Sequence, residues 1–194
     1  MFLDKRFWVK AFSLILLAGS TSVGCGGQPP ESDASQSKLA IAATRKLQLG
    51  DLEGALKDYD RAIAQNPKEA DAYVNRGIVR DELGQHAAAI ADYTQALTLN
   101  PDLHLAYYNR ANAYVQEKQY QKAIADYDKA IELEPDYAYA YANRGSAQLK
   151  VGDSQSAISD LKQASEIFAS KNDRKNVQRL ERMLTSLTTV PADR

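Results

Sequence analysis

This 194-residue chain has few of the side chains on which most catalytic and metal sites depend. It contains one cysteine, Cys25, and two histidines, His86 and His104. A disulfide within the chain is therefore impossible, and a metal site of histidines and cysteines cannot be assembled. No serine or cysteine has a recognisable base partner, so we expect no catalytic site, no cofactor and no small-molecule substrate.

The chain also lacks an excess of charge of either sign. Its 24 lysines and arginines nearly balance 25 aspartates and glutamates, and the formal net charge is −1. Proteins that bind nucleic acids usually present a basic stripe, so we expect no nucleic-acid partner. Hydrophobic residues make up 44% of the sequence, which is enough for a domain with its own core.

A long hydrophobic run is missing as well. The apolar stretch 11–18 is far shorter than the roughly 20 residues that a membrane-spanning helix needs. It follows Lys5, Arg6 and Lys10 and precedes a series of small residues, which is the order found in secretory signals. We therefore predict that residues 1–24 are a signal peptide.

The only cysteine follows directly after this signal. The letters SVGC resemble the lipobox of bacterial lipoproteins, although Ser22 stands where that family usually has leucine. The resemblance implies cleavage before Cys25, acylation of this residue, and a protein anchored to a bacterial membrane that faces the periplasm or the exterior. Cleavage after Ser20 or Gly24 would instead give a soluble periplasmic protein, and an uncleaved signal would itself be an anchor.

Residues 25–35 are rich in glycine, proline and serine and show no apolar periodicity. We interpret them as a flexible tether with a mean reach of roughly 17 to 20 Å. At the other end of the chain, residues 188–194 are expected to be a disordered tail.

From residue 36 onward the sequence repeats with an offset of 34 residues, most clearly from Tyr73, Tyr107 and Tyr141. Apolar residues recur at three- and four-residue spacing in two runs per copy, which predicts two amphipathic helices in each. Glycine marks the first turn of three copies and suits a helix end with positive φ, so Lys118 at the same place should be strained by about 1 kcal/mol. Proline marks the second turn at Pro67, Pro101 and Pro135.

This order of residues resembles the tetratricopeptide repeat, a helix-turn-helix unit of 34 residues. In the second copy the resemblance is carried by Tyr73, Gly77, Ala89, Tyr93, Ala96 and Pro101. It implies an all-α fold, an α-solenoid of four repeats at 36–69, 70–103, 104–137 and 138–171. Residues 172–187 carry apolar side chains on one face and are predicted to be a C-terminal capping helix.

Arginine precedes the small residue of the first helix in three copies, where the family usually has leucine. Each copy also has an acid in its second helix. We expect each arginine to pair with the acid of the preceding copy, which leaves Asp160 to the basic cap. The expected pairs are Arg76 with Asp58, Arg110 with Asp92, and Arg144 with Asp126.

In tetratricopeptide arrays the first helices line a concave face that holds peptides. Asparagines recur there in this chain, and in some relatives asparagines at this place bind the backbone of a peptide through their amide donor and acceptor. The resemblance implies a peptide site formed by Asn75, Asn109 and Asn143 with Val74, Ile78, Tyr108 and Asn112. The alternative is that the asparagines bond neighbouring helices.

The predicted function is that of a non-enzymatic scaffold or adaptor, tethered to the membrane through Cys25, with partner proteins on the concave face. The alternative is a chaperone-like holdase for exported or membrane subunits. The cations of the chaperone-binding subfamily are absent at Val74, Tyr108 and Ala142, so an acidic C-terminal tail is not the expected ligand. His86 is expected to have a packing role, and the open face at 36–49 is a possible homodimer contact.

Overall fold

The computed structural model describes residues 37–188, and this part of the chain contains helices and turns but no strand. The predicted signal peptide, Cys25 and the tether lie outside the described residues. So do residues 189–194, whereas Thr188 ends the last helix. The helices are α2 (Lys38–Gln48), α3 (Leu52–Gln65), α4 (Ala70–Glu82), α5 (His86–Leu99), α6 (His104–Gln116), α7 (Tyr120–Leu133), α8 (Ala138–Lys150), α9 (Ser154–Ser170) and α10 (Arg174–Thr188).

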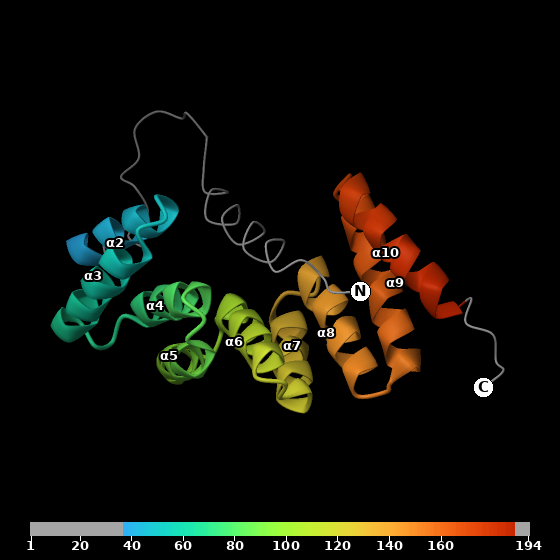
Figure 1. The fold of residues 1–194 in the computed structure, drawn as a ribbon, viewed down its shortest axis with the longest axis horizontal. Helices are drawn as coiled ribbons and strands as arrows, with labels where there is room; N and C mark the ends of the chain where they lie inside the picture. Colours follow the sequence, from blue (N-terminus) through green and yellow to red (C-terminus); the bar gives the residue numbers. More distant parts are fainter. Residues whose placement is uncertain (1–36, 189–194) are drawn as a thin grey trace.

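Each of the four expected repeats contains two helices that pack on each other, and its second helix packs on the first helix of the next pair. Figure 1 shows the pairs following one another along a curved row, from α2 at one end to α10 at the other. Each first helix also contacts the next first helix, in the order α2, α4, α6 and α8. In the described part of the chain, successive second helices contact each other less. The first helices therefore lie on the inner side of the curve, and the all-α solenoid with a terminal helix is confirmed.

The turns follow from backbone conformation. Gly50, Gly84 and Gly152 have φ of 79°, 75° and 86°, and Lys118 adopts φ 58° at the equivalent place, as predicted. A side chain in this left-handed region is costly, so three of the four repeats use glycine there. Asn172, also at φ 58°, ends α9 in the same way and was not predicted.

The core is built from alanines around one large residue per repeat. Tyr59, Tyr93, Tyr127 and Leu161 are fully buried, and each contacts alanines of the same and the neighbouring helices. α10 closes the last repeat by burying Leu180 against α8 and α9. Because the helices meet across alanine, they approach closely, and a larger side chain at these places would overpack the joint.

The arginine pairing differs from the prediction, because each arginine binds the acid of its own repeat. Arg76 Nε and Nη2 donate to Asp92 at 3.0 and 2.6 Å, and Arg110 and Arg144 bind Asp126 and Asp160 in the same bidentate way. The two helices of one repeat are antiparallel and in contact, so residues 16 apart face each other. The predicted partner of Arg76, Asp58, instead accepts a hydrogen bond from Lys46 Nζ at 2.6 Å.

The arginines do reach the preceding repeat, but through other residues. Nη1 of Arg76, Arg110 and Arg144 donates to Asp60, Thr94 and Asp128, at 2.8, 3.0 and 2.5 Å. Each arginine therefore joins the second helices of two successive repeats, and we call each such set of three residues a rung. For Arg76, burial lowers the pKa, but the hydrogen bonds to Asp92 and Asp60 outweigh it and the pKa is raised.

Candidate functional site

The inner side of the array is formed by α2, α4, α6 and α8, which carry all the residues predicted to bind a peptide. In α4, Val74, Asn75 and Ile78 are half-buried. Val74 and Ile78 pack beside Ala89, Tyr93 and Ala113, at the joint between the second and third repeats. Together with Asn143 of α8, these three residues of α4 are the part of the predicted site that keeps some exposed surface.

The three asparagines do not form a uniform series. Asn109 is 4% exposed, while Asn75 and Asn143 are half-buried. Asn143 Nδ2 donates to Tyr108 Oη at 3.0 Å and to Asn112 Oδ1 at 3.1 Å, so its amide is used in joining α8 to α6. Peptide binding by the predicted residues stays a prediction, and its direct contacts are restricted to the half-buried positions.

Tyr108, Asn112, Tyr127 and Asn143 form a hydrogen-bonded group that we call the tyrosine–asparagine cluster. Tyr127 Oη donates to Asn112 Oδ1 at 2.6 Å, and the ring of Tyr108 lies against those of Tyr127 and Tyr137. Burial raises the pKa of Tyr108 to about 12, although its hydrogen bonds oppose the shift, so the hydroxyl stays protonated. The cluster holds the third and fourth repeats together from the inner side.

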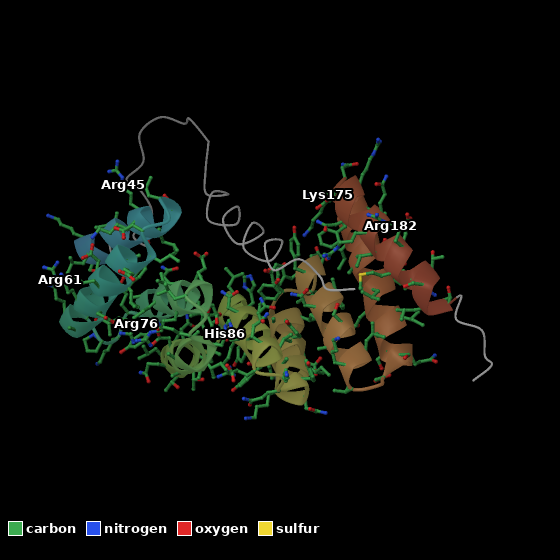
Figure 2. The ribbon with its side chains drawn as sticks, viewed as in Figure 1. Arg45, Arg61, Arg76, His86, Lys175 and Arg182 are labelled. Atoms are coloured by element: carbon green, nitrogen blue, oxygen red, sulfur yellow. The ribbon has the colours of Figure 1, made fainter. Side chains whose placement is uncertain are left out.

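A second polar group surrounds the hydroxyl of Tyr93, which is the equivalent of Tyr127 in the second repeat. Asp81 accepts a hydrogen bond from Tyr93 Oη at 2.9 Å, and its other oxygen lies 3.0 Å from His86 Nδ1. Burial raises the pKa of Asp81, while the hydrogen bonds to His86 and Tyr93 oppose that shift. Figure 2 labels His86 at the centre of the array, where it serves to pair Asp81, a role that the sequence did not predict.

Within residues 37–188, the second histidine, His104, packs on a tyrosine ring. The two rings, of His104 and Tyr137, are T-shaped relative to each other, at a centroid distance of 5.7 Å. No group of three or more histidines, cysteines or acids in this part is placed to hold a metal ion. Across the same residues, each helix is too short or too polar to traverse a bilayer.

Sequence profiles described as tetratricopeptide repeat match residues 42–104, 104–137 and 126–159, and together they run without a gap from 42 to 159. The chain belongs to the tetratricopeptide repeat family. A comparison with curated proteins found no match. Tetratricopeptide units are in general interaction modules, which agrees with the expectation of a protein that binds proteins.

Solved tetratricopeptide structures share the fold at low sequence identity. A crystal structure of MamA is 20% identical, with a TM-score of 0.62 over 75% of this chain and 94% of that chain. A second MamA structure is 24% identical, with a TM-score of 0.66 over 74% of this chain and 79% of that one. The first tetratricopeptide domain of Spaghetti (RPAP3), bound to the HSP90 peptide SRMEEVD, is 23% identical, with a TM-score of 0.58 over 59% of this chain and 90% of that chain.

Two kinds of residue were not predicted from the sequence. One is the residue of the preceding repeat that completes each rung, and the other is Asp81, which accepts a hydrogen bond from Tyr93. Asp60, Thr94 and Asp128 stand at 34-residue spacing, two places after the acids that were singled out, and this spacing was the available signal. Asp81 has no counterpart among the equivalent residues Leu47, Val115 and Leu149, so the repeat pattern gave no indication of it.

Proposed function

We propose that this tetratricopeptide protein is a membrane-tethered, non-enzymatic scaffold that binds partner polypeptides along the inner side of the array. The observation that carries the proposal is the arrangement of α2, α4, α6 and α8 on that side, with Val74, Asn75 and Ile78 only half-buried. A mixed apolar and amide surface suits an extended or helical peptide, because it offers van der Waals contact and backbone hydrogen bonds together.

The ligand proposed for this surface differs from that of the solved RPAP3 domain, whose peptide SRMEEVD is acidic. Val74, Tyr108 and Ala142 place no cation on the first helices where chaperone-binding relatives have them. The two cations of α4, Arg76 and Arg80, both bind Asp92, so neither is placed to hold the carboxylate of a ligand. We therefore expect a partner segment other than an acidic C-terminal tail.

Photo-crosslinking in cells tests the binding surface. A photoreactive residue at Ile78 should give discrete adducts with one or a few proteins, and the same group at exposed Gln95 on α5 is the matched control. Equal adducts from both sites would contradict inner-face binding. Adducts with many unrelated proteins, together with suppressed aggregation of unrelated substrates, would instead support a chaperone-like holdase.

The tether is tested separately. Acyl labelling should be present in the wild-type chain and absent from Cys25→Ala. Trp8 is the only tryptophan, so protein processed before Cys25 should show no tryptophan emission. Label-free protein that keeps Trp8 emission would point to an uncleaved signal, and label-free protein without emission would point to a soluble periplasmic form.

A further inference from the structure

The face that α2 turns away from the rest of the array differs from the same face of α4, α6 and α8. In those three helices this face packs on the preceding repeat through small residues, which are fully or almost fully buried. They are Ala72, Val79, Ala106, Ala113, Ala140 and Ala147. At the two equivalent places α2 has Lys38 and Arg45, both exposed.

The substitution of cations for alanine and valine makes this face unsuitable for another repeat. A joint of this kind has no room for a lysine or arginine side chain, and it would bury their charges without partners. Figure 2 shows Arg45 pointing away from the helix stack at the end where α2 lies. The array is therefore closed to further stacking at its N-terminal end.

The same face also carries the most exposed large apolar side chains of the described residues. Ile41 is 54% exposed and Leu49 is 77% exposed, whereas Leu133 and Val151 are 38% exposed. Lys38, Ile41, Ala42, Arg45, Gln48 and Leu49 are all exposed and follow the three- and four-residue spacing of one helix face. We call these six residues the α2 outer face.

The charge of α2 restricts what can cover this face. The helix contains Lys38, Arg45 and Lys46 and no acid, and Lys46 is already paired with Asp58. A second copy placed α2 to α2 would bring cations together. A copy placed α2 to α10 would do the same, because α10 carries four basic residues and the single acid Glu181. The possible homodimer through residues 36–49 is disfavoured on this ground.

Basic side chains beside exposed aliphatic ones are typical of helices that lie on anionic bilayers. The 36 residues that precede the described part, with the proposed anchor Cys25, join it at Ser37, immediately before α2. We propose that the α2 outer face docks on the anionic lipid surface of the membrane, an inference that rests on the proposed tether. The tether brings this face close to lipid, and docking then fixes which end of the array meets the bilayer.

Vesicle binding of the full chain tests the electrostatic part. The chain carries Cys25→Ala, so that no acyl group contributes, and the vesicles contain phosphatidylcholine with or without phosphatidylglycerol. Each cation at an anionic surface contributes about fivefold in affinity, so Lys38→Gln with Arg45→Gln should weaken binding to anionic vesicles about thirtyfold. Lys68→Gln with Lys162→Gln removes the same charge from exposed sites elsewhere and should change binding less than about twofold. Equal effects of the two pairs would overturn the proposal.

A fluorescent reporter makes the test independent of how strongly residues 1–36 bind vesicles. In a Trp8→Phe background, the emission of Leu49→Trp should shift to shorter wavelength on anionic vesicles, and that of Leu133→Trp, on α7, should not. No shift from Leu49→Trp would overturn docking. A shift already present without lipid would mean that residues 1–36 cover the face or, if the shift depends on concentration, that a second copy covers it. A shift seen only with an acidic protein would mean that this protein covers the face.

These readouts separate the α2 outer face from the proposed tether. If the protein is acylated but its Leu49→Trp emission is unchanged on vesicles, the tether is supported and the docking proposal is wrong. Protein without acylation would end the tether, and the Cys25→Ala vesicle measurements would still decide whether α2 has affinity for lipid.

Discussion

The second repeat (70–103) and the third (104–137) share a backbone but differ in the groups that pair inside it. Arg76 lies between two carboxylates, Asp92 and Asp60, whereas the rung of Arg110 has Asp126 and the hydroxyl of Thr94. The 34-residue frame therefore fixes where a polar group must be paired. It leaves open whether the partner is charged or neutral.

The buried tyrosines differ in the partner of their hydroxyl, and the small residue that each ring packs on differs with it. Tyr93 Oη donates to Asp81, one turn beyond Gly77, while Tyr127 Oη donates to Asn112, directly after Ala111. A Cβ added at Gly77 would lie 2.6 Å from Cε1 of Tyr93, so only glycine fits there. The first repeat behaves like the third, because Tyr59 bonds Thr44 directly after Ala43. In these three repeats, the choice between glycine and alanine therefore varies with the partner of the tyrosine hydroxyl.

Removal of Asp126 should have the largest effect, because the rung of Arg110 contains no second carboxylate. The side chains of Arg110 and Asp126 are only 16% and 10% exposed, so Asp126→Ala should lower the free energy of unfolding by about 3 kcal/mol. Asp160→Ala is the matched control and should cost about 2 kcal/mol, because Asp128 still binds Arg144. Urea unfolding followed by circular dichroism measures the free energy lost in each variant. An equal loss would show that Asp128 does not offset the removal of Asp160.

Gly77→Ala tests the link between hydroxyl partner and small residue. The new methyl group overlaps the ring of Tyr93, so the variant should lose about 2 kcal/mol of unfolding free energy. Adding Ile78→Asn and Asp81→Val gives the second repeat the acceptor arrangement of the third and should recover part of the loss. Thermal unfolding of the single and combined variants decides the matter, and no recovery would mean that the ring is positioned by packing alone.

The period, the helix pairs and the turns could be predicted from the sequence because they depend on local rules. Gly84 and Lys118 share a left-handed conformation that is set by the helix end each residue follows. The partners of Arg110 could not be predicted, since Asp92 lies 18 residues before it and Asp126 lies 16 after it. Only the packing of the two helices separates these possibilities. The recurring asparagines likewise look equivalent in sequence, but Asn109 is buried and Asn75 is half-buried.

The charged second repeat should also make stability depend on pH. Burial raises the pKa of Asp81 above its ordinary value of 3.8, so the folded state binds a proton more tightly than the unfolded state. The contribution of Asp81 to stability is therefore fully present below about pH 3.8 and is lost as the pH rises through its folded pKa. The stability of the wild type relative to Asp81→Asn should fall across this window. Parallel curves for the two proteins would contradict the shift.

Thr94→Asp should have the smallest effect, because it converts the rung of the third repeat into that of the second. Thr94 Oγ1 accepts from Arg110 Nη1 at 3.0 Å, the place that Asp60 and Asp128 take beside Arg76 and Arg144. A half-exposed carboxylate there should add about 0.5 kcal/mol to the free energy of unfolding, and salt should reduce this gain. Thr98→Asp adds the same charge one turn further along α5, outside the rung. A similar gain from Thr98→Asp would mean that net charge, rather than the rung, is responsible.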